Sequence, residues 1–368
     1  MIFGVVVVVD GWKALGKAPE GERRARMEAS AQWEDGKFVN PQPMWNDAWG
    51  MLFERSQEPR VPAIGTFPVV EGALAGWAVA PASGLRVTWL GHSTLWLEID
   101  GFTLLTDPVW GQRTAPVDWL GPERWVPPVV ALAEMPVPDA VLISHDHYDH
   151  LDAPTFETIA SWDTLFVVPL GVAAHLEYWG VPPERIRELD WWDEVQLGDL
   201  RLVSTPARHA SGRQVFDQMR TLWTSYAIVG PVHRVYFSGD TGLFPGLREI
   251  GERFGPFDLT MIESGAYSPS WPDWHLGPEQ AVKAHEWVRG KAMLPIHWGM
   301  FNLALHSWTA PAERSLAAAQ ARGVKLVMPR VGELVEPSLA PAQPVPWWPR
   351  DIPFRDASAY PVQATRVD

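Results

Sequence analysis

DAVLISHDHYDHLD, residues 139–152, joins an apolar run to a cluster of histidines and aspartates. Its first part, DAVLIS, is the kind of continuous apolar run that forms a strand buried on both faces. Asp152 is suited to cap a following helix, in which Pro154 takes an early position. The segment therefore predicts a buried strand, a polar loop and a helix in succession. The loop holds four residues of metal-binding type, which are His145, His147, Asp149 and His150.

The density of this polar loop predicts a metal site. His145 and His147 stand two positions apart, and both can turn to one side only in extended or loop backbone, which the end of a strand provides. Asp149 and His150 follow at the start of the next turn, where they can face a second point in space. Burying four such side chains is costly unless their polar atoms find partners. A solvated polar loop is the other interpretation, but further matching residues in the chain disfavour it.

Three further residues of the same types follow apolar runs elsewhere in the chain. They are His209 in STPARHASGR, Asp240 in VYFSGDTG and His297 in MLPIHWG. Because sites in α/β architectures assemble at one end of the sheet, we expect these residues to meet the loop there. Nitrogen and oxygen donors suit Zn²⁺, with Fe and Mn as alternatives. Together the donors are too many for one tetrahedral ion, which predicts two ions.

The composition narrows the classes of partner and chemistry. The chain has 368 residues, 46% of them hydrophobic and 20% charged, as in ordinary globular proteins. Its net charge of −14 disfavours a nucleic-acid partner, because binding to the phosphate backbone depends on concentrated Lys and Arg. The negative net charge does not exclude an anionic substrate, since bound metal ions can make the electrostatic potential at the site positive. The absence of cysteine excludes disulfides, thiolate nucleophiles and Cys-based zinc sites.

Short strand-like runs alternate with helical segments over most of the chain. Two of these runs, TLWLEI and FTLLTD, are separated by Asp100-Gly101, a dipeptide typical of hairpin turns. Alternation over about 250 residues predicts a single α/β core. We place this core at residues 81–335. An N-terminal extension packed on the core takes residues 1–80, and a Pro- and Trp-rich C-terminal tail takes residues 336–368.

The N-terminal sequence, MIFGVVVVVDGW, contains an apolar run that Asp10 ends. This run lacks the basic start and the cleavage site of a signal peptide, and it is far too short to span a bilayer. One interpretation is a strand, and the other is the remnant of a longer membrane anchor that begins upstream of Met1. Because no other long apolar run is present, we expect a soluble protein of the cytoplasm, with membrane association left open.

The order of these motifs resembles the binuclear metallo-β-lactamase superfamily, in which HDHYDH is followed by a lone His, a GDTG aspartate and a late His. The resemblance is closer to the branch that contains N-acylphosphatidylethanolamine-hydrolysing phospholipase D and its bacterial relatives, and it covers about residues 40–335. It implies an αββα sandwich with the metals at the edge between the two sheets. The segments that carry it are LGHSTLWLEIDGFTLLTDPVW, DAVLISHDHYDHLD, ELDWW, PARH, TLWTSYAI, FSGDTG, FDLTMIESGAY, HLGPEQAVKAH and PIHWGMFNLALHSW.

The resemblance also implies how the donors divide between the two ions. It assigns His145, His147 and His209 to one metal, Asp149, His150 and His297 to the other, and Asp240 to both. A hydroxide between the ions would be the nucleophile, because both charges lower its pKa. Asp149 and Asp240 therefore count as catalytic residues as well as ligands.

Further residues are implied to lie near the substrate. The resemblance places His275, in WHLGPEQAV, beside the substrate, where an imidazole can act as general acid or hydrogen-bond partner. Tyr148 and Arg213 match family positions near the phosphate or the pocket. His306 is expected either to line the pocket or to pack beside Trp308.

Two residues are candidates for orienting the metal ligands. His92 follows a strand in LGHST, and Asp107 stands in LTDP. Either side chain can hold a ligand by a hydrogen bond. The alternatives are a structural role for His92 and a turn cap for Asp107.

The predicted function is hydrolysis of a phosphodiester by a dinuclear zinc enzyme of the phospholipase D-like type, since two-metal sites suit in-line displacement at phosphorus. The alternative keeps the metals but makes the substrate a lactone, a β-lactam or a carboxylic ester. A non-catalytic metal-binding scaffold is the remote alternative, although all seven donor positions are filled. The predicted partner is a small-molecule or lipid phosphodiester and not a nucleic acid. Contact with a membrane surface and a homo-oligomeric state are both compatible with the sequence.

Overall fold

The computed structural model describes residues 11–367. The apolar run of residues 1–10, and with it the choice between a strand and the remnant of an anchor, lies outside the described residues. Within 11–367, none of the helices has the length and apolarity that crossing a membrane requires.

The Asp100–Gly101 turn builds the hairpin that the sequence predicts. It connects β4 (Leu95–Ile99) to β5 (Phe102–Thr106), and the two strands are antiparallel. Both turn residues have a positive φ, 51° at Asp100 and 89° at Gly101, as a two-residue turn of this kind requires. Glycine adopts this conformation freely and aspartate tolerates it, so the dipeptide fixes the pairing of the two strands.

Among residues 11–367, the strands form two seven-stranded sheets and one small two-stranded sheet. The first large sheet has the order β16 (Leu334–Val335), β3 (Leu85–Trp89), β4, β5, β6 (Ala140–Leu142), β7 (Leu165–Pro169) and β8 (Ile186–Leu189). The second has the order β15 (Lys325–Leu326), β14 (Ala292–Ile296), β13 (Leu259–Glu263), β12 (Arg234–Phe237), β11 (Ser225–Val229), β10 (Leu200–Thr205) and β9 (Glu194–Leu197). The small sheet pairs β1 (Trp33–Glu34) with β2 (Lys37–Phe38).

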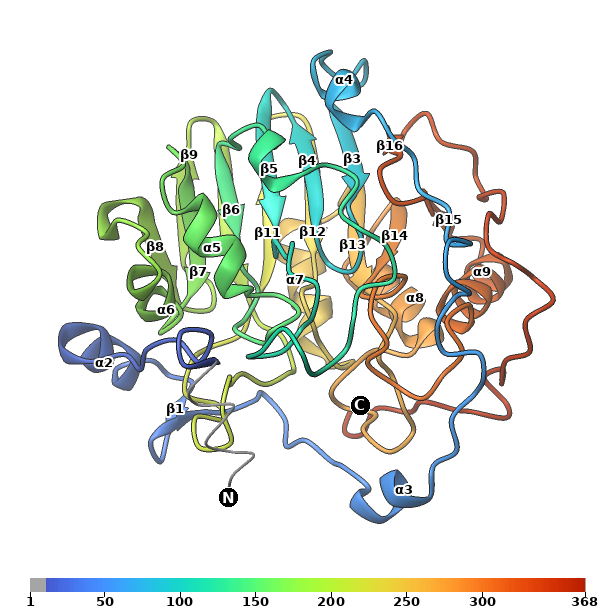
Figure 1. The fold of residues 1–368 in the computed structure, drawn as a ribbon, viewed down its shortest axis with the longest axis horizontal. Helices are drawn as coiled ribbons and strands as arrows, with labels where there is room; N and C mark the ends of the chain where they lie inside the picture. The colour runs from blue at the N-terminus through green and yellow to red at the C-terminus, as the bar shows by residue number, and fades with distance from the viewer. Residues whose placement is uncertain (1–10, 368) are drawn as a thin grey trace.

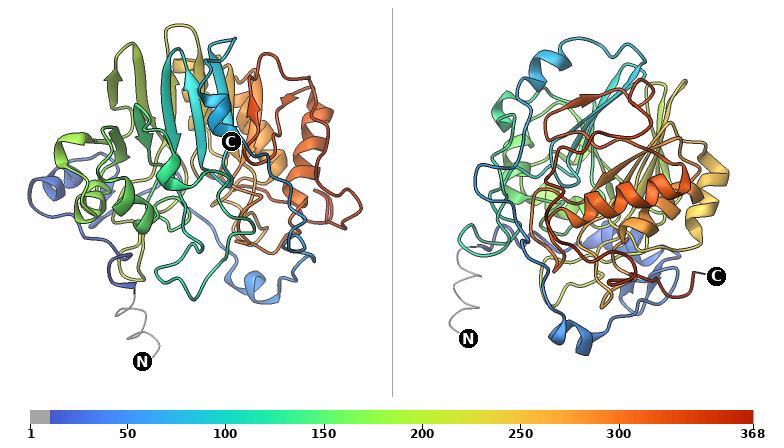
Figure 2. Two further views of the ribbon diagram at one scale, coloured as in Figure 1. Left: turned by 45° about the horizontal axis from the view of Figure 1, so that its top comes forward. Right: turned by 90° about the vertical axis from the view of Figure 1, so that its right-hand side faces the viewer.

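Helices cover the outer faces of the two large sheets, as Figures 1 and 2 show. The outer face of the first sheet carries α5 (Ala153–Ile159) and α6 (Ala173–Tyr178), and that of the second carries α7 (Gly246–Phe254), α8 (Pro278–Trp287) and α9 (Ala310–Arg322). The other α-helices that lie wholly within the described residues are α2 (Gly21–Glu28), α3 (Ala48–Phe53) and α4 (Ala73–Trp77), and 3₁₀ turns occupy Leu132–Glu134 and Pro183–Arg185. The layers therefore read helix, sheet, sheet, helix, which confirms the predicted αββα sandwich.

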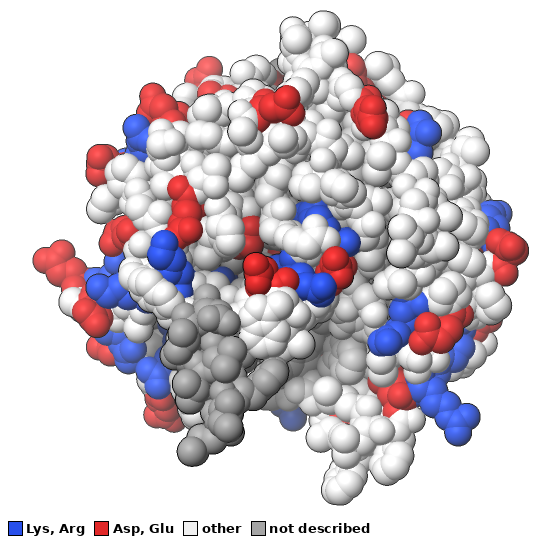
Figure 3. Space-filling model, in the orientation of Figure 1, with Lys and Arg blue, Asp and Glu red and all other residues white. Residues whose placement is uncertain are grey.

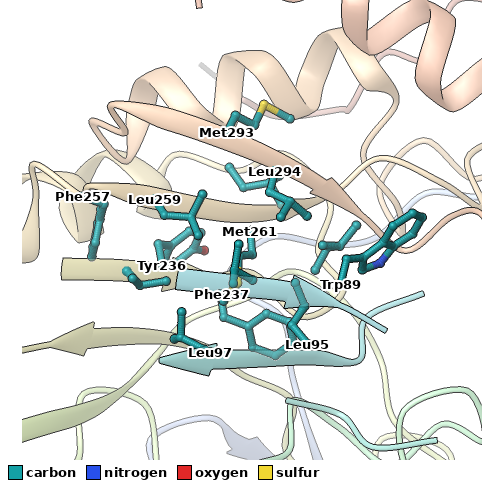
Figure 4. Packing of buried hydrophobic residues seen from close by; sticks show 14 of the residues in the cluster. Trp89, Leu95, Leu97, Tyr236, Phe237, Phe257, Leu259, Met261, Met293 and Leu294 are labelled. Carbon is teal, nitrogen blue, oxygen red and sulfur yellow. The ribbon is translucent and has the colours of Figure 1, made fainter. Parts of the chain in front are cut away.

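The two-residue period of the strands explains this layering. In β4, Leu95 and Leu97 face the core between the sheets, where they join Phe237 and Met261 of the second sheet (Figure 4). Trp96, between them in sequence, faces the opposite side and joins the core beneath α5 and α6. Strands with apolar residues on both faces need cover on both sides, and the second sheet and the helices supply it.

The edges of the sheets depart from the sequence-based expectation. The apolar run KLVMP, residues 325–329, favours a longer strand, but β15 contains only two of its residues. β16, which pairs with β3, is also two residues long, and two residues are too few to show a period in the sequence. All strands of both large sheets lie between Leu85 and Val335. Among the described residues after Glu336 there is neither helix nor strand.

The core placement of Leu97 can be tested by unfolding. Leu97 has no exposed surface, so Leu97→Ala should lower the free energy of unfolding by about 2–5 kcal/mol. Leu339 is 70% exposed, and Leu339→Ala is the control, with an expected change below about 0.5 kcal/mol. Urea titration followed by circular dichroism measures both variants. Equal destabilisation by the two substitutions would contradict the packing described here.

Candidate metal centre

Each predicted metal donor stands shortly after the end of a strand. Residues 145–150 follow β6, His209 follows β10, Asp240 follows β12 and His297 follows β14. β6 belongs to the first sheet and the other three strands to the second. The loops after these strands gather along the lower edge of the sheets in Figure 1. The structure thus brings the seven predicted donors together from both sheets.

His145, His147 and His209 form the first donor cluster. His147 Nδ1 lies 2.8 Å from His145 Nε2 and 3.3 Å from His209 Nε2. His209 Nδ1 donates a hydrogen bond to the Trp274 carbonyl oxygen at 2.9 Å, which leaves the Nε2 lone pair facing the cluster. His145 Nδ1 lies 2.9 Å from Ser144 Oγ on the side away from the cluster. The three rings therefore aim one nitrogen each at a common point.

Asp149, His150, His297 and Asp240 form the second donor cluster. His297 Nε2 lies 3.3 Å from Asp149 Oδ2 and 3.0 Å from Asp240 Oδ2. His150 Nε2 lies 3.4 Å and 3.2 Å from the same two atoms. Burial opposes the charge on both aspartates, but the adjacent histidines outweigh it and hold the pKa of each carboxyl well below its usual range. Asp240 Oδ2 is also 3.6 Å from His209 Nε2, so Asp240 lies between the two clusters.

Buried lone pairs without partners show that this donor set fits metal ions. His147 Nδ1 faces two other ring nitrogens, and one proton can serve only one of these contacts. Asp240 Oδ1 is buried without a hydrogen-bond partner, and His150 Nε2 faces only the carboxylate oxygens of Asp149 and Asp240. Burial also lowers the pKa of His145 and His209 well below its usual value, so both rings are in the neutral form that binds metals. A divalent cation in each cluster would supply the partner that the protein does not.

The second donor cluster is held from behind by Asp107 and His92, at the positions predicted for orienting residues. His150 Nδ1 donates to Asp107 Oδ2 at 2.7 Å, and Asp107 Oδ1 accepts from the Ser144 amide at 2.7 Å. Burial lowers the pKa of His92 to about 3, so a neutral ring donates from Nε2 to Asp149 Oδ2 at 2.9 Å. Hydrogen bonds of this kind fix the tautomer and the orientation of metal ligands.

Glu263 is a residue of the site that the sequence analysis does not single out. It ends β13, has no exposed surface, and places Oε2 2.8 Å from His275 Nδ1. Its Oε1 accepts from the Thr241 amide at 2.5 Å. Burial lowers the pKa of His275 to about 4 and raises that of Glu263 well above its usual value, so the neutral form of each group is favoured where the two meet in one hydrogen bond. Glu263 follows the apolar run DLTMI as the predicted donors follow theirs, and this signal could have identified it.

The donor clusters form the polar end of a cavity of about 470 Å³. The polar residues that line it are Asn46, His147, Asp149, Asp240, His275 and His297. The apolar residues that line it include Met51, Trp271, Trp274 and Leu303. His275 thus lies beside the metal donors on a loop that also contributes two tryptophans.

The structure corrects the expected positions of Tyr148 and Arg213. The Arg213 guanidinium is buried and donates to the carbonyl oxygens of Asp146 and Leu151, both at 2.7 Å. Its guanidinium carbon lies 4.2 Å from the centre of the Tyr148 ring, and the Tyr148 hydroxyl donates to the Arg213 carbonyl oxygen at 2.7 Å. Neither side chain lines the cavity described above. The Arg213 guanidinium donates its hydrogen bonds to backbone carbonyl oxygens and not to a substrate phosphate. Arg213 and Tyr148 therefore stabilise the loop that carries the metal donors.

His306 lies in a small hollow next to the main cavity. It lines this hollow together with Trp308, His297 and Leu303, the last two of which also line the main cavity. Its ring stacks on Tyr267 at a centroid distance of 4.4 Å. His306 therefore lies beside the main cavity without lining it, and it shares the small hollow with Trp308.

The chain belongs to the metallo-β-lactamase superfamily of metal-dependent hydrolases. Residues 103–298 match the model of the beta-lactamase superfamily domain. An uncharacterized protein of Mycobacterium tuberculosis is 46% identical over 349 residues, which cover 91% of each chain. The family predicted from the motifs is confirmed, and with it the general class of hydrolase.

Two further comparisons bear on the branch and on the fold. The chain is 36% identical over 233 residues to N-acyl-phosphatidylethanolamine-hydrolyzing phospholipase D 1 of Caenorhabditis elegans, covering 60% of this chain and 65% of that protein. A metallo hydrolase of Ignicoccus hospitalis has a similar structure, with a TM-score of 0.54 and 23% identity over 68% of this chain and 97% of that one. The latter likeness supports the fold alone.

The two donor clusters predict that the protein binds two divalent ions per chain. Asp240→Asn should remove at least one of them, because Asp240 contacts both clusters. The protein is loaded with Zn²⁺ and passed through a gel-filtration column to remove unbound ions. Elemental analysis then measures the number of zinc ions per chain. Asp163→Asn is the control, since the Asp163 side chain is 97% exposed. Less than one ion bound by the unsubstituted protein in Zn²⁺, Mn²⁺ and Fe²⁺ alike would contradict the assignment.

Proposed function

We propose that the protein is a dinuclear metal-dependent phosphodiesterase whose substrate is a lipid phosphodiester of the N-acyl phospholipid type. The observation that carries the proposal is the His275–Glu263 pair, which lies beside two adjoining donor clusters in one cavity. His275 Nδ1 is engaged by Glu263, so Nε2 is the nitrogen left to meet a substrate. Zn²⁺ is the proposed metal because the donors are imidazoles and carboxylates.

The donor set fits the division that the family resemblance implies. His145, His147 and His209 would hold one ion, Asp149, His150 and His297 the other, and Asp240 both. Two ions bound there would lower the pKa of a water molecule and stabilise charge on the phosphoryl oxygens. The contribution of the protein is to hold Asp149 and His150 in place through His92 and Asp107.

His275 can serve the leaving group of such a reaction. An alkoxide that departs from phosphorus needs a proton, and an imidazole at the edge of the cavity can donate one from Nε2. As Nε2 gives up its proton, Nδ1 can take the proton shared with Glu263, so the ring stays neutral. His275 is therefore proposed as the general acid and Glu263 as the group that orients and supplies it.

The surface beside the cavity favours a lipid over a small polar substrate. Met51 of α3 lines the cavity, and its neighbours Trp49, Leu52 and Phe53 are 74%, 72% and 77% exposed. Exposed apolar groups that cluster at a cavity mouth mark contact with an apolar partner. A phosphodiester at the metal end would leave its acyl chains near α3. This arrangement agrees with the likeness to an N-acyl-phosphatidylethanolamine-hydrolyzing enzyme.

A nucleic acid is not proposed as the phosphodiester. Figure 3 shows acidic and basic side chains interspersed on the face in view, without an extended basic area. The net charge of −14 also disfavours a nucleic acid, because binding to a phosphate backbone requires concentrated positive charge.

A substrate panel tests the proposed function. The zinc-loaded protein should hydrolyse bis-p-nitrophenyl phosphate, and it should hydrolyse N-acylphosphatidylethanolamine in mixed micelles with a higher kcat/KM, because only the lipid uses the apolar surroundings. A lactone and nitrocefin should react slowly or not at all. Removal of the metal by a chelator should abolish turnover, and Zn²⁺ should restore it. Hydrolysis of the lactone or of nitrocefin with no activity on either phosphodiester would contradict the proposal.

The role of His275 gives a second prediction. His275→Gln should lower kcat on the phosphodiester by about 10²-fold or more, the usual scale for a general acid, with both metals retained. His233→Gln is the matched control, since His233 pairs with Asp100 at the hairpin turn and should leave kcat unchanged. Steady-state kinetics and metal analysis on each variant measure the effect. Undiminished kcat in metal-loaded His275→Gln would remove His275 from the mechanism.

A further inference from the structure

Both terminal extensions reach the loop that carries His275. Residues 40–45 belong to the N-terminal extension and Thr365 to the C-terminal tail. They meet at Asp273, two positions before His275 in the sequence, and at Arg208, which precedes the metal donor His209. This meeting point lies outside the set of residues that the metal chemistry itself requires.

Arg208 and Asp273 form a buried ion pair at this point. Arg208 Nη1 lies 2.9 Å from Asp273 Oδ1, and neither residue has any exposed surface. The Asp273 carboxylate accepts from the amide and the hydroxyl of Thr365, both at 2.7 Å, and from the Trp45 amide at 2.9 Å. Arg208 donates to the carbonyl oxygens of Thr365 at 2.9 Å and Pro43 at 2.8 Å. One ion pair thus ties both extensions to the loop.

The same region is tied to the metal centre through His209. The Asn40 side chain donates to the His209 carbonyl oxygen at 2.6 Å and accepts from the His209 amide at 2.9 Å. The Trp274 carbonyl oxygen accepts from His209 Nδ1 at 2.9 Å. Because Trp274 lies between Asp273 and His275 in the sequence, the loop is fixed to a metal donor on one side and to the extensions on the other.

The packing around the ion pair resists displacement of the loop. A Cβ added to Gly242 would lie 2.0 Å from the Asp273 carbonyl oxygen, so only glycine allows this close approach. Removing one partner of a buried ion pair leaves the other charge without compensation. Displacing Asp273 therefore breaks the ion pair and the hydrogen bonds of its carboxylate to both extensions.

We propose that Arg208 and Asp273 are positioning residues, which use the two terminal extensions to hold His275 over the metal centre. The inference rests on the function proposed above for His275. A pair with a merely structural role would affect folding stability alone. A positioning pair also sets kcat, since a displacement of about 1 Å from the reacting geometry can cost about 10²-fold in rate.

The test compares Asp273→Asn with Glu98→Gln in the zinc-loaded full-length protein. The substrate is N-acylphosphatidylethanolamine in mixed micelles, because its alkoxide leaving group needs the proton that His275 is proposed to donate. Glu98 is the matched control, because its buried ion pair with Arg86 joins β4 to β3 outside the cavity. Asp273→Asn should lower kcat by about 10- to 100-fold with little change in KM and with both metals retained. Glu98→Gln should lower Tm and leave kcat of the folded protein unchanged.

A milder pair of variants keeps the test valid if Asp273→Asn folds poorly. Thr365→Val removes the hydroxyl that donates to Asp273, whereas Thr365→Ser keeps it. Thr365→Val should lower kcat, and Thr365→Ser should restore it. In the His275→Gln background, Asp273→Asn should lower kcat little further, because both changes act through the same imidazole.

Three outcomes would overturn the positioning role. They are an unchanged kcat in Asp273→Asn, multiplicative effects of Asp273→Asn and His275→Gln, and loss of metal in parallel with kcat. Amide hydrogen exchange measures, without a substrate, how firmly the ion pair holds the loop that carries His275. Faster exchange of residues 271–276 in Asp273→Asn but not in Glu98→Gln would support it, and equal exchange would overturn it. If the unsubstituted protein hydrolyses no phosphodiester, the proposed function fails while the exchange measurement still decides whether the ion pair holds the loop.

Discussion

Ring nitrogens and carboxylate oxygens converge at one edge of the paired sheets, and the crowding of these buried donor atoms is the constraint on which the surrounding structure depends. Asp240 Oδ2 alone lies within 3.6 Å of nitrogens from His150, His209 and His297. In a buried setting such a group is unfavourable unless cations or protons separate its members. The neighbouring hydrogen bonds do not relieve this convergence. Asp107 and the Trp274 carbonyl instead fix the rings so that their lone pairs stay aimed at one another.

The centre also depends on how the two sheets pack. The loop of residues 145–150 comes from the first sheet, whereas His209, Asp240, Glu263 and His297 come from the second. The distances between the donors are therefore set by the apolar core between the sheets as much as by the loops. Glu263 ends a strand of the second sheet, and its hydrogen bond with His275 places a titratable pair on that side of the metal centre.

Much of the fold and the donor set can be predicted from sequence, because each of these elements has a signal within its own stretch of sequence. The hairpin has its own turn dipeptide, and each donor follows an apolar run. Other parts depend on contacts between distant positions. Asp273 acquires its role only when Thr365 and Arg208 arrive beside it, and no local pattern signals that meeting. The motif resemblance identifies Arg213 as a residue near the site, but it does not give the direction of the side chain. In the structure the Arg213 guanidinium donates to backbone carbonyl oxygens. Glu263 has the same signal as the donors, but its partner is twelve residues away.

The central claim is that the donors form two adjoining metal sites that share Asp240. Anomalous X-ray diffraction from crystals of the zinc-loaded protein, recorded above and below the zinc absorption edge, tests it directly. The account predicts two peaks about 3.5–4 Å apart, the usual spacing of two-metal sites. One peak should lie among His145, His147 and His209, and the other beside Asp149, His150 and His297, with Asp240 contacting both. A single peak, or two peaks without Asp240 between them, would contradict the account.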